Sequence, residues 1–257
     1  MRQESYPVAT STPLSRFLVQ HLDVTPGMNC LDVGCGAGSS LHEMLGLVSP
    51  GGVVVGVDVD QDVLVEAEAA TWAASQIALC RADAMCLPFD GGTFDAVSAS
   101  LLLLWVPEAI KVIQELVRVT GTGGRVAFVD LDLSAMRIEP ALPIWETFAA
   151  ALEAFQQNHG FDGEIGRRLY GFCHHAGLID LRIQAQPALV VGGTLHAADA
   201  VHLTTGPLAT AMVDEDYLSL AQLTQLQHEL EMRMADSASL FVGGITYGVS
   251  GQVPEPA

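Results

Sequence analysis

Glycine and aspartate residues stand where this chain could hold a small ligand. Residues 30–40 run from an apolar stretch through Asp32 into a loop that contains Gly34, Gly36 and Gly38. Because glycine has no side chain, such a loop can turn sharply and lie directly against a ligand. The amide groups that open the following helix would face the same ligand.

The composition of this loop favours a ligand with a cationic end over a pyrophosphate. The dinucleotide fingerprint G-x-G-x-x-G requires a third glycine at the position of Ser39. Asp32 lies two residues before the loop, and its fixed carboxylate would face the negative charge of a pyrophosphate. A P-loop is excluded as well, because no Gly-Lys-Ser/Thr sequence follows these glycines.

Three aspartates stand at the ends of three consecutive predicted strands, namely Asp32, Asp58 and Asp83. In an open parallel sheet the carboxyl ends of the strands form the ligand crevice. There Asp58 could accept hydrogen bonds from both hydroxyls of a ribose, and Asp83 from the exocyclic amine of an adenine. Asp32 would favour an amino group or a sulfonium. Any one of them alone could equally be a turn-forming residue, but together with the glycine loop they predict S-adenosylmethionine as the cofactor.

The elements that must position these residues are strands and helices that alternate from residue 29 to residue 131. Short β-branched or apolar runs indicate strands, and apolar residues at helical spacing indicate the helices between them. Asp60 is expected to cap one of these helices. Such alternation predicts a doubly wound α/β fold with a mostly parallel sheet. The strands expected in this half cover residues 29–33, 53–57, 77–81, 93–98 and 125–131.

After residue 132 the pattern is looser. Strands over residues 181–191 and 240–249 would complete a seven-stranded sheet. Helices are expected after Pro143 and over residues 166–176, 196–206 and 214–234.

The chain is expected to contain two parts. Residues 1–24 form a lead-in with a helix that could act as a lid, and residues 25–257 form the main domain. Two helical insertions, at about 134–160 and 196–234, would cap the crevice and shape an apolar pocket.

Charge and cysteine content limit the partners and the location that we expect. The chain carries 11 basic and 30 acidic residues, a net charge of −19, which disfavours nucleic acids and anionic membranes as partners. No apolar run is long enough to span a membrane, and residues 1–12 lack the order of a signal peptide. The five cysteines form no C-x-x-C pair, which indicates reduced thiols in the cytoplasm.

Several segments resemble the successive motifs of a known enzyme family. Residues 31–38, Asp58, residues 82–89 and residues 94–97 are similar to the motifs of class I S-adenosylmethionine-dependent methyltransferases. Residues 166–178 also resemble the branch that contains the ubiquinone and menaquinone biosynthesis methyltransferases. The resemblance implies a Rossmann-like methyltransferase fold, and it is specific for the cofactor rather than for the acceptor.

The resemblance also implies roles for single residues at the cofactor. The loop that begins at Asp32 would hold the methionine end, Val59 would lie against the adenine, and Ser100 and Leu101 would lie near the sulfonium. Such proteins often place a histidine where this chain has Leu104, so we expect no base at that position. The cofactor-binding residues that we expect are Asp32, Gly34, Cys35, Gly36, Gly38, Asp58, Val59, Asp83, Ala84, Met85, Ser100 and Leu101.

The sequence leaves the catalytic residues unknown. Methyl transfer to an activated acceptor needs mainly proximity and in-line alignment, and a base is required only where the acceptor must lose a proton. His159 and Tyr6 come from segments that would cover the pocket, and they are the candidates to test first. We expect no metal ion, and in particular no joint metal site at Asp130 and Asp132.

The acidic surface and the apolar cap favour a small, largely apolar acceptor, such as a quinone-, phenol- or polyketide-like metabolite. One alternative is an enzyme that binds the same cofactor but catalyses cyclisation or decarboxylation. Another is a non-catalytic partner subunit of a methyltransferase, against which the intact glycine loop and the three aspartates argue. The oligomeric state stays open, with a homodimer as one alternative.

Overall fold

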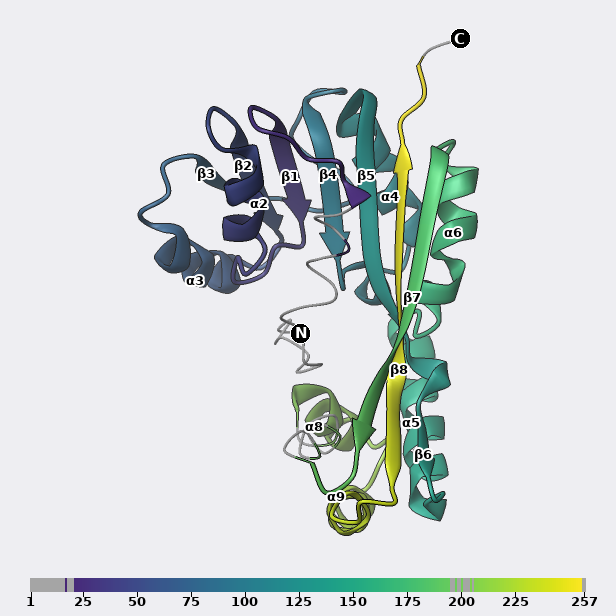
Figure 1. The fold of residues 1–257 in the computed structure, drawn as a ribbon. Coiled ribbons are helices and arrows are strands. Elements are labelled where there is room, and N and C mark those ends of the chain that lie inside the picture. Colours follow the sequence, from purple (N-terminus) through teal and green to yellow (C-terminus); the bar gives the residue numbers. More distant parts are fainter. Residues whose placement is uncertain are drawn as a thin grey trace.

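The first half of the chain forms strands and helices in alternation, as its pattern predicts (Figure 1). The computed structural model describes residue 17, residues 21–194, residues 197, 200 and 204, and residues 206–255. The strands of the first half are β1 (Asn29–Val33), β2 (Val53–Asp58), β3 (Ile77–Arg81), β4 (Phe94–Ser100) and β5 (Thr120–Asp132). The helices between them are α2 (Leu41–Val48), α3 (Gln61–Thr71) and α4 (Ala109–Val119).

Local sequence accounts for these elements. β2 is rich in valine, and Val54 and Val57 are fully buried, as expected for a parallel strand with both faces covered. The predicted cap of α3 is confirmed, because Oδ1 of Asp60 accepts a hydrogen bond from the amide of Asp62 at 2.8 Å. β2 therefore ends and α3 begins within a few residues of the crevice.

The second half adds antiparallel strands and most of the helices. They are the 3₁₀ turns η1 (Leu103–Trp105) and η2 (Leu133–Ala135), the strands β6 (Arg137–Glu139), β7 (Ile179–Val191) and β8 (Leu240–Gln252), and the helices α5 (Pro143–His159), α6 (Ile165–His175), α8 (Pro207–Asp214) and α9 (Leu220–Met234). No helix among the described residues is long and apolar enough to cross a membrane.

The described strands form one sheet in the order β3-β2-β1-β4-β5-β8-β6, with β7 paired to β8. β1 to β5 pair in parallel, whereas β8 runs antiparallel to β5, β6 and β7. The prediction of a doubly wound, mostly parallel sheet is confirmed. The carboxyl ends of β1 to β5 therefore share one edge, which is where a ligand crevice is expected.

β7 and β8 are long strands, and they extend beyond the parallel part of the sheet (Figure 1). The far ends of both strands carry β6, α5, α8 and α9, which we call the cap. Within the cap, α5 contacts α8 and α9, and α8 contacts α9. One antiparallel ribbon thus belongs to both the parallel sheet and the cap.

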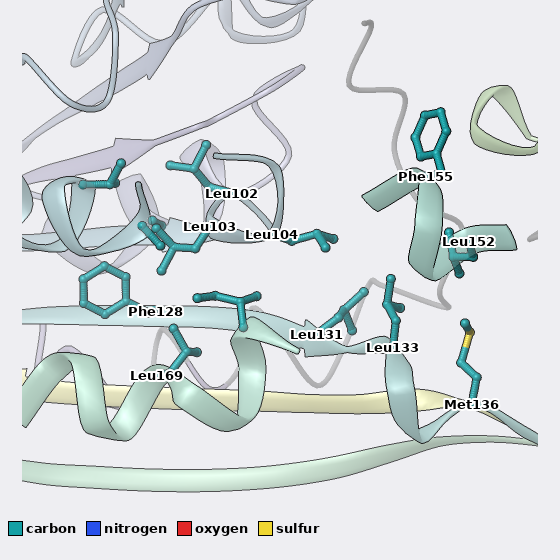
Figure 2. Close-up of a cluster of buried hydrophobic side chains, with 14 of the residues drawn as sticks. Leu102, Leu103, Leu104, Phe128, Leu131, Leu133, Met136, Leu152, Phe155 and Leu169 are labelled. Carbon is teal, nitrogen blue, oxygen red and sulfur yellow. The ribbon is translucent and has the colours of Figure 1, made fainter. Parts of the chain in front are cut away.

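The hydrophobic core runs continuously from the sheet into the cap. One cluster joins Ile113 of α4 and Phe128 of β5 to Phe155 of α5 and Leu226 of α9. Figure 2 shows Leu131 and Leu133 between the leucines that follow β4 and the cap side chains Leu152 and Phe155. A second cluster on the opposite face contains Phe17, Leu22, Leu41, Met44 and Leu64. The sheet is therefore covered on both faces.

Three features of the second half differ from the sequence predictions. The single helix expected over residues 214–234 is wrong: Asp216 adopts a φ of 62°, and Ser219 starts α9 with a capping box that includes Gln222. β6 adds an eighth strand, which is too short to give a sequence pattern. β5 begins at Thr120, so the glycines at 121–124 lie inside the strand instead of before it. Most of the predicted helix over 196–206, and most of residues 1–24, lie outside the described residues.

Candidate functional site

The glycine loop lies at the carboxyl edge of the sheet, between the ends of β1 and β2. Gly34, Gly36 and Gly38 have φ values of 75°, 52° and 82°, a left-handed conformation that favours glycine. The amides of Gly34 and Cys35 donate to the carbonyl of Val57 at 2.7 and 3.0 Å. Backbone hydrogen bonds therefore hold the start of the loop on the end of β2.

Asp58 connects the loop to the same edge through its side chain. One carboxylate oxygen accepts from the amide of Gly36 at 3.0 Å, and the other accepts from the amide of Asp60 at 3.0 Å. The residue is only 3% exposed. A carboxylate has about four acceptor positions, so Asp58 retains the capacity to bind hydroxyl groups as well.

Asp32 lies beneath the loop. Its Oδ1 accepts from the hydroxyl of Ser98 at 2.7 Å, and its Oδ2 accepts from the hydroxyl of Ser40. Burial raises the pKa of Asp32, although both hydroxyl groups favour the ionised form. Asp32 thus joins β1, β4 and the start of α2. Neither Ser40, before α2, nor Ser98, inside β4, is identifiable from the sequence, because single serines at such positions carry no distinct signal.

Cys35 contributes its backbone and a buried side chain to the loop. Its sulfur would lie 3.0 Å from a methyl group built on Gly56 of β2. Burial, together with the nearby Asp32 and Asp58, raises the pKa of the Cys35 thiol. The thiol is therefore neutral at physiological pH and fills the space left by Gly56.

The ends of β2 and β3 present more accessible groups. Val59 is 63% exposed, and its carbonyl accepts from Nε of Arg81 at 3.0 Å. Asp83 is exposed, and its Oδ1 accepts from the amide of Met85 at 2.8 Å. Ala84 and Met85 are half-buried. Asp83, Ala84 and Met85 form a tight turn at the open edge, and Val59 presents an apolar side chain at the same edge.

An ion pair on α4 holds the segment that follows this turn. Glu115 accepts from the amide of Leu87 at 2.7 Å, and Arg118 donates to the carbonyls of Leu87 and Phe89 at 3.2 and 2.9 Å. Glu115 and Arg118 also bind each other at 2.7 Å, which lowers the pKa of Glu115. This contact is not readable from the sequence, since Glu and Arg three residues apart on a helix are common.

The turn after β4 contacts the glycine loop. Leu101 has a φ of 54°, and its amide donates to the carbonyl of Val129 at 2.8 Å. A methyl group built on Gly34 would lie 3.1 Å from Cδ1 of Leu102. Ser100 and Leu101 are half-buried. The turn that follows Ser100 and Leu101 therefore lies against the loop through Leu102.

His159 lies at the end of α5, in an aromatic cluster formed with Phe155, Phe161 and Tyr217 (centroid distances 4.2, 5.6 and 6.3 Å). Its Nδ1 lies 2.9 Å from the carbonyl of Phe155, and its Nε2 lies 3.1 Å from the carboxylate of Glu215. Both ring nitrogens of His159 are therefore engaged, one by a backbone carbonyl and one by a carboxylate. Tyr6, the other candidate, lies outside the described residues.

Asp130 and Asp132 have separate partners. Residues two apart on a strand share a face, so the strand itself does not separate their side chains. Asp130 accepts from two backbone amides of η1 and from the amide of Leu131 in β5, whereas Asp132 binds Nε of Arg167 at 2.6 Å and the hydroxyl of Ser134 at 2.8 Å. Within the part of the chain that the structure describes, no group of three or more His, Cys, Asp or Glu residues could hold a metal ion.

Part of the chain is similar to a protein-family model and to curated proteins. Residues 31–128 match the family model described as a methyltransferase domain. A demethylmenaquinone methyltransferase from Shouchella clausii is 31% identical over 130 residues, which cover 50% of this chain and 53% of the relative. A nocamycin O-methyltransferase from Saccharothrix syringae is 34% identical over 116 residues, which cover 44% and 41%. The chain spans about half the length of the curated relatives that it matches first.

Solved structures share the fold over nearly the whole chain. A putative methyltransferase from Bacillus halodurans has a TM-score of 0.62 at 17% identity and covers 94% of this chain and 99% of its own. The [4+2]-cyclase SpnF has a TM-score of 0.60 at 18% identity and covers 98% and 85%. At these identities the likeness shows the fold alone. The family match and the fold together confirm the resemblance to class I methyltransferases.

Proposed function

We propose that this protein, whose residues 31–128 carry a methyltransferase domain, transfers the methyl group of S-adenosylmethionine to a small, largely apolar metabolite. The observation that carries the proposal is the hydrogen bond of 3.0 Å from the amide of Gly36 to Asp58. It holds the left-handed glycine loop at the edge where the ends of β1, β2 and β3 meet. A loop fixed in this way is ready to bind before the ligand arrives, which lowers the entropy cost of binding.

The three strand ends suit different parts of the cofactor. We assign the methionine end to the loop between Asp32 and Gly38. The ribose hydroxyls fit Asp58, whose carboxylate retains acceptor positions. The adenine fits the space bordered by Val59 and the turn that contains Asp83, Ala84 and Met85. The fully buried Asp32 then supports the loop and adds negative charge beneath the cationic end.

The chain's own residues would contribute orientation more than acid–base chemistry. S-adenosylmethionine supplies the activated methyl group; a nucleophilic atom of the acceptor bonds to its carbon as the carbon–sulfur bond breaks. Ser100 and Leu101 would line the path of the methyl group. His159, if it acts as a base, must first release one of its two acceptor contacts. His159 and Tyr6 therefore stay candidates for an acceptor that must lose a proton.

Aromatic side chains between the site and the cap support an apolar acceptor. The ring of Trp105 packs on Phe161 at 5.2 Å, and Phe155 packs edge-on against Tyr217 at 5.3 Å. Trp105, Phe161 and Tyr217 are half-buried, so their rings would offer flat, apolar surfaces to a planar substrate, whereas Phe155 is fully buried. The net charge of −19 disfavours anionic polymers as substrates. Quinone-, phenol- and polyketide-like molecules are accordingly the acceptors to test.

A second candidate function is cyclisation or another reaction without methyl transfer. The structural similarity to the [4+2]-cyclase SpnF, with a TM-score of 0.60, favours testing it. Such an enzyme would bind S-adenosylmethionine without converting it to S-adenosylhomocysteine.

Two measurements test the proposal. Calorimetry should detect binding of S-adenosylmethionine and S-adenosylhomocysteine. Incubation with quinones, phenols and polyketide-like compounds should then give a product heavier by one methyl group and an equal amount of S-adenosylhomocysteine. Binding without S-adenosylhomocysteine formation across these acceptors would favour the second candidate, and a protein that binds neither compound would contradict both.

Matched glycine variants locate the cofactor in the same experiment. Gly36 and Gly46 both have open space for a methyl group, but only Gly36 has a positive φ. Gly36→Ala should weaken binding of S-adenosylhomocysteine, because it strains the loop and adds a side chain at the ligand surface. Gly46→Ala lies in α2 and should bind normally.

We further propose a cytoplasmic location, supported by the absence of disulfides among the five cysteines, all of which are free. A homodimer stays a proposal, for which sedimentation at several protein concentrations is the test.

A further inference from the structure

A buried carboxylate lies beneath the turn that follows β4. Asp130, at the end of β5, is 1% exposed, and it forms no ion pair with a described cationic residue. Its Oδ2 accepts from the amides of Leu103 and Leu104 at 2.7 and 3.2 Å, and its Oδ1 from the amide of Leu131 at 2.9 Å. Burying a carboxylate without a cation is unfavourable, so its presence requires an explanation.

The turn that Asp130 holds is itself strained. Leu101 has a φ of 54°, a left-handed conformation that is costly for a leucine. Two adjacent residues of β5 hold this turn from its two ends. The carbonyl of Val129 accepts from the amide of Leu101 at 2.8 Å, and the carboxylate of Asp130 binds the amides that begin η1. A strained turn persists only where its surroundings fix it.

The same turn touches both the glycine loop and the segment that leads out of the cap. Leu102 lies against Gly34, with 3.1 Å between its Cδ1 and a methyl group built on that glycine. On the other side, the carbonyl of Leu104 accepts from the amide of Asp162 at 3.2 Å. Figure 2 shows Leu102, Leu103 and Leu104 above Phe128 of β5, with Phe155 of the cap beyond them. The turn is therefore the link between the cofactor side and the acceptor side.

We propose that Asp130 is a positioning residue for the reaction: its carboxylate fixes residues 101–105 and thereby sets the position of the glycine loop relative to the cap. The inference rests on the cofactor site proposed above. Asp130 touches neither the loop nor the cofactor residues directly, and it acts through Leu102 and Leu104. In-line transfer is sensitive to displacements of about 1 Å, so a residue that fixes this link affects binding and reaction.

The ionised form of Asp130 is the one that holds the turn. Both oxygens face amide donors, and such hydrogen bonds are stronger to a carboxylate than to a neutral carboxyl group. Burial, with a smaller contribution from the nearby Asp162, raises the pKa of Asp130 to about 7, although the three amides lower it. Tyr247 of β8 is the residue paired with Asp130 in the sheet. Arg167 of α6 binds Asp132 instead. The turn should therefore be held more firmly above neutral pH than below it.

Two asparagine variants test the proposal. Asp130→Asn removes the charge and places an amide group among the three donors. Asp132→Asn is the matched control, because Asp132 lies on the same strand and is also 1% exposed, but it binds η2 and Arg167 instead of the turn. Hydrogen exchange detected by mass spectrometry reports on the amides of Leu103 and Leu104. Calorimetry with S-adenosylhomocysteine, at about pH 6 and about pH 8, reports on the loop.

The expected result is specific to Asp130. In Asp130→Asn the amides of Leu103 and Leu104 exchange faster, and affinity for S-adenosylhomocysteine at the higher pH falls by roughly fivefold or more. Wild type and Asp132→Asn should bind more tightly at the higher pH, whereas Asp130→Asn should lose this difference. The wild-type measurement tests the pH dependence even if the variant fails to fold.

Three results would overturn the inference, and they are distinguishable. If Asp130→Asn binds with wild-type affinity, or wild type shows no pH dependence, Asp130 serves the fold alone. If the wild-type protein does not bind S-adenosylhomocysteine at all, the cofactor site itself is wrong, and this inference fails with it.

Discussion

The cofactor half of the molecule, residues 29–132, and the cap are built by different kinds of interaction. In the cofactor half, backbone hydrogen bonds between parallel strands bring Asp32, Asp58 and Asp83 to one edge. In the cap, side-chain packing determines the arrangement, as in the contacts of Trp145 with Phe148 and Phe241 at 5.4 and 5.5 Å. Backbone hydrogen bonds do not depend on which side chains a strand carries, whereas packed side chains depend on one another's volumes.

The two regions nevertheless share one hydrophobic core, which leads to the largest effect that we expect. Phe155 of the cap is fully buried in the cluster that also contains Phe128 of β5. Phe155→Ala should lower the free energy of unfolding by about 3–5 kcal/mol. Chemical denaturation followed by circular dichroism and tryptophan fluorescence should give one shared transition.

The matched control for Phe155→Ala is Trp72→Ala in the cofactor half, where the side chain is 84% exposed. That substitution should change stability by less than about 0.5 kcal/mol. If the two probes give separate transitions, the cap and the cofactor half are independent units and the shared core is not cooperative.

Asp130, which holds the turn between the two regions, should make the free energy of unfolding depend on pH. Burial raises the pKa of Asp130 from 3.8 to about 7. Between these values the folded protein keeps a proton that the unfolded chain has released. The free energy of unfolding contributed by Asp130 is therefore fully present below about pH 4 and is lost as the pH rises to about 7.

Urea denaturation of Asp130→Asn and Asp132→Asn at a series of pH values measures this contribution. We expect Asp130→Asn to lack the decrease of a few kcal/mol between about pH 4 and about pH 7, and Asp132→Asn to keep it. If the free energy of unfolding changes equally with pH in both variants, Asp130 does not titrate in this range. If the free energy of unfolding decreases in this way, the folded protein is less stable when Asp130 is ionised, which is the form that holds the turn. The protein would then lose stability for the sake of function.

The smallest effect that we expect belongs to the cofactor half alone. Asp58→Ala removes the acceptor of the Gly36 amide and the proposed ribose contact, so affinity for S-adenosylmethionine should fall by about 1–3 kcal/mol. Asp60→Ala removes only the cap of α3 and should cost about 1 kcal/mol of stability without changing affinity. Calorimetry of both variants tests the assignment, and unchanged affinity in Asp58→Ala would place the ribose elsewhere.

The sequence was sufficient for the elements of the cofactor half. Strand bounds such as Asn29–Val33 and Ile77–Arg81, and the cap at Asp60, are as predicted. Glycines, β-branched runs and capping residues act locally, so their pattern is readable without the rest of the chain. In the cap, the predicted helix over 214–234 fails because the break at Asp216 depends on a left-handed residue that is not glycine.

What the sequence determined by itself is the type of fold and the set of strand-end aspartates, because both follow from the order of local patterns along the chain. Only the tertiary structure decided what these carboxylates do. Asp32 is bound by Ser40 and Ser98, and Asp130 lies beneath η1. Ser98 and Asp32 are 66 residues apart in sequence, and contacts at that distance depend on how strands pair, which no local pattern encodes.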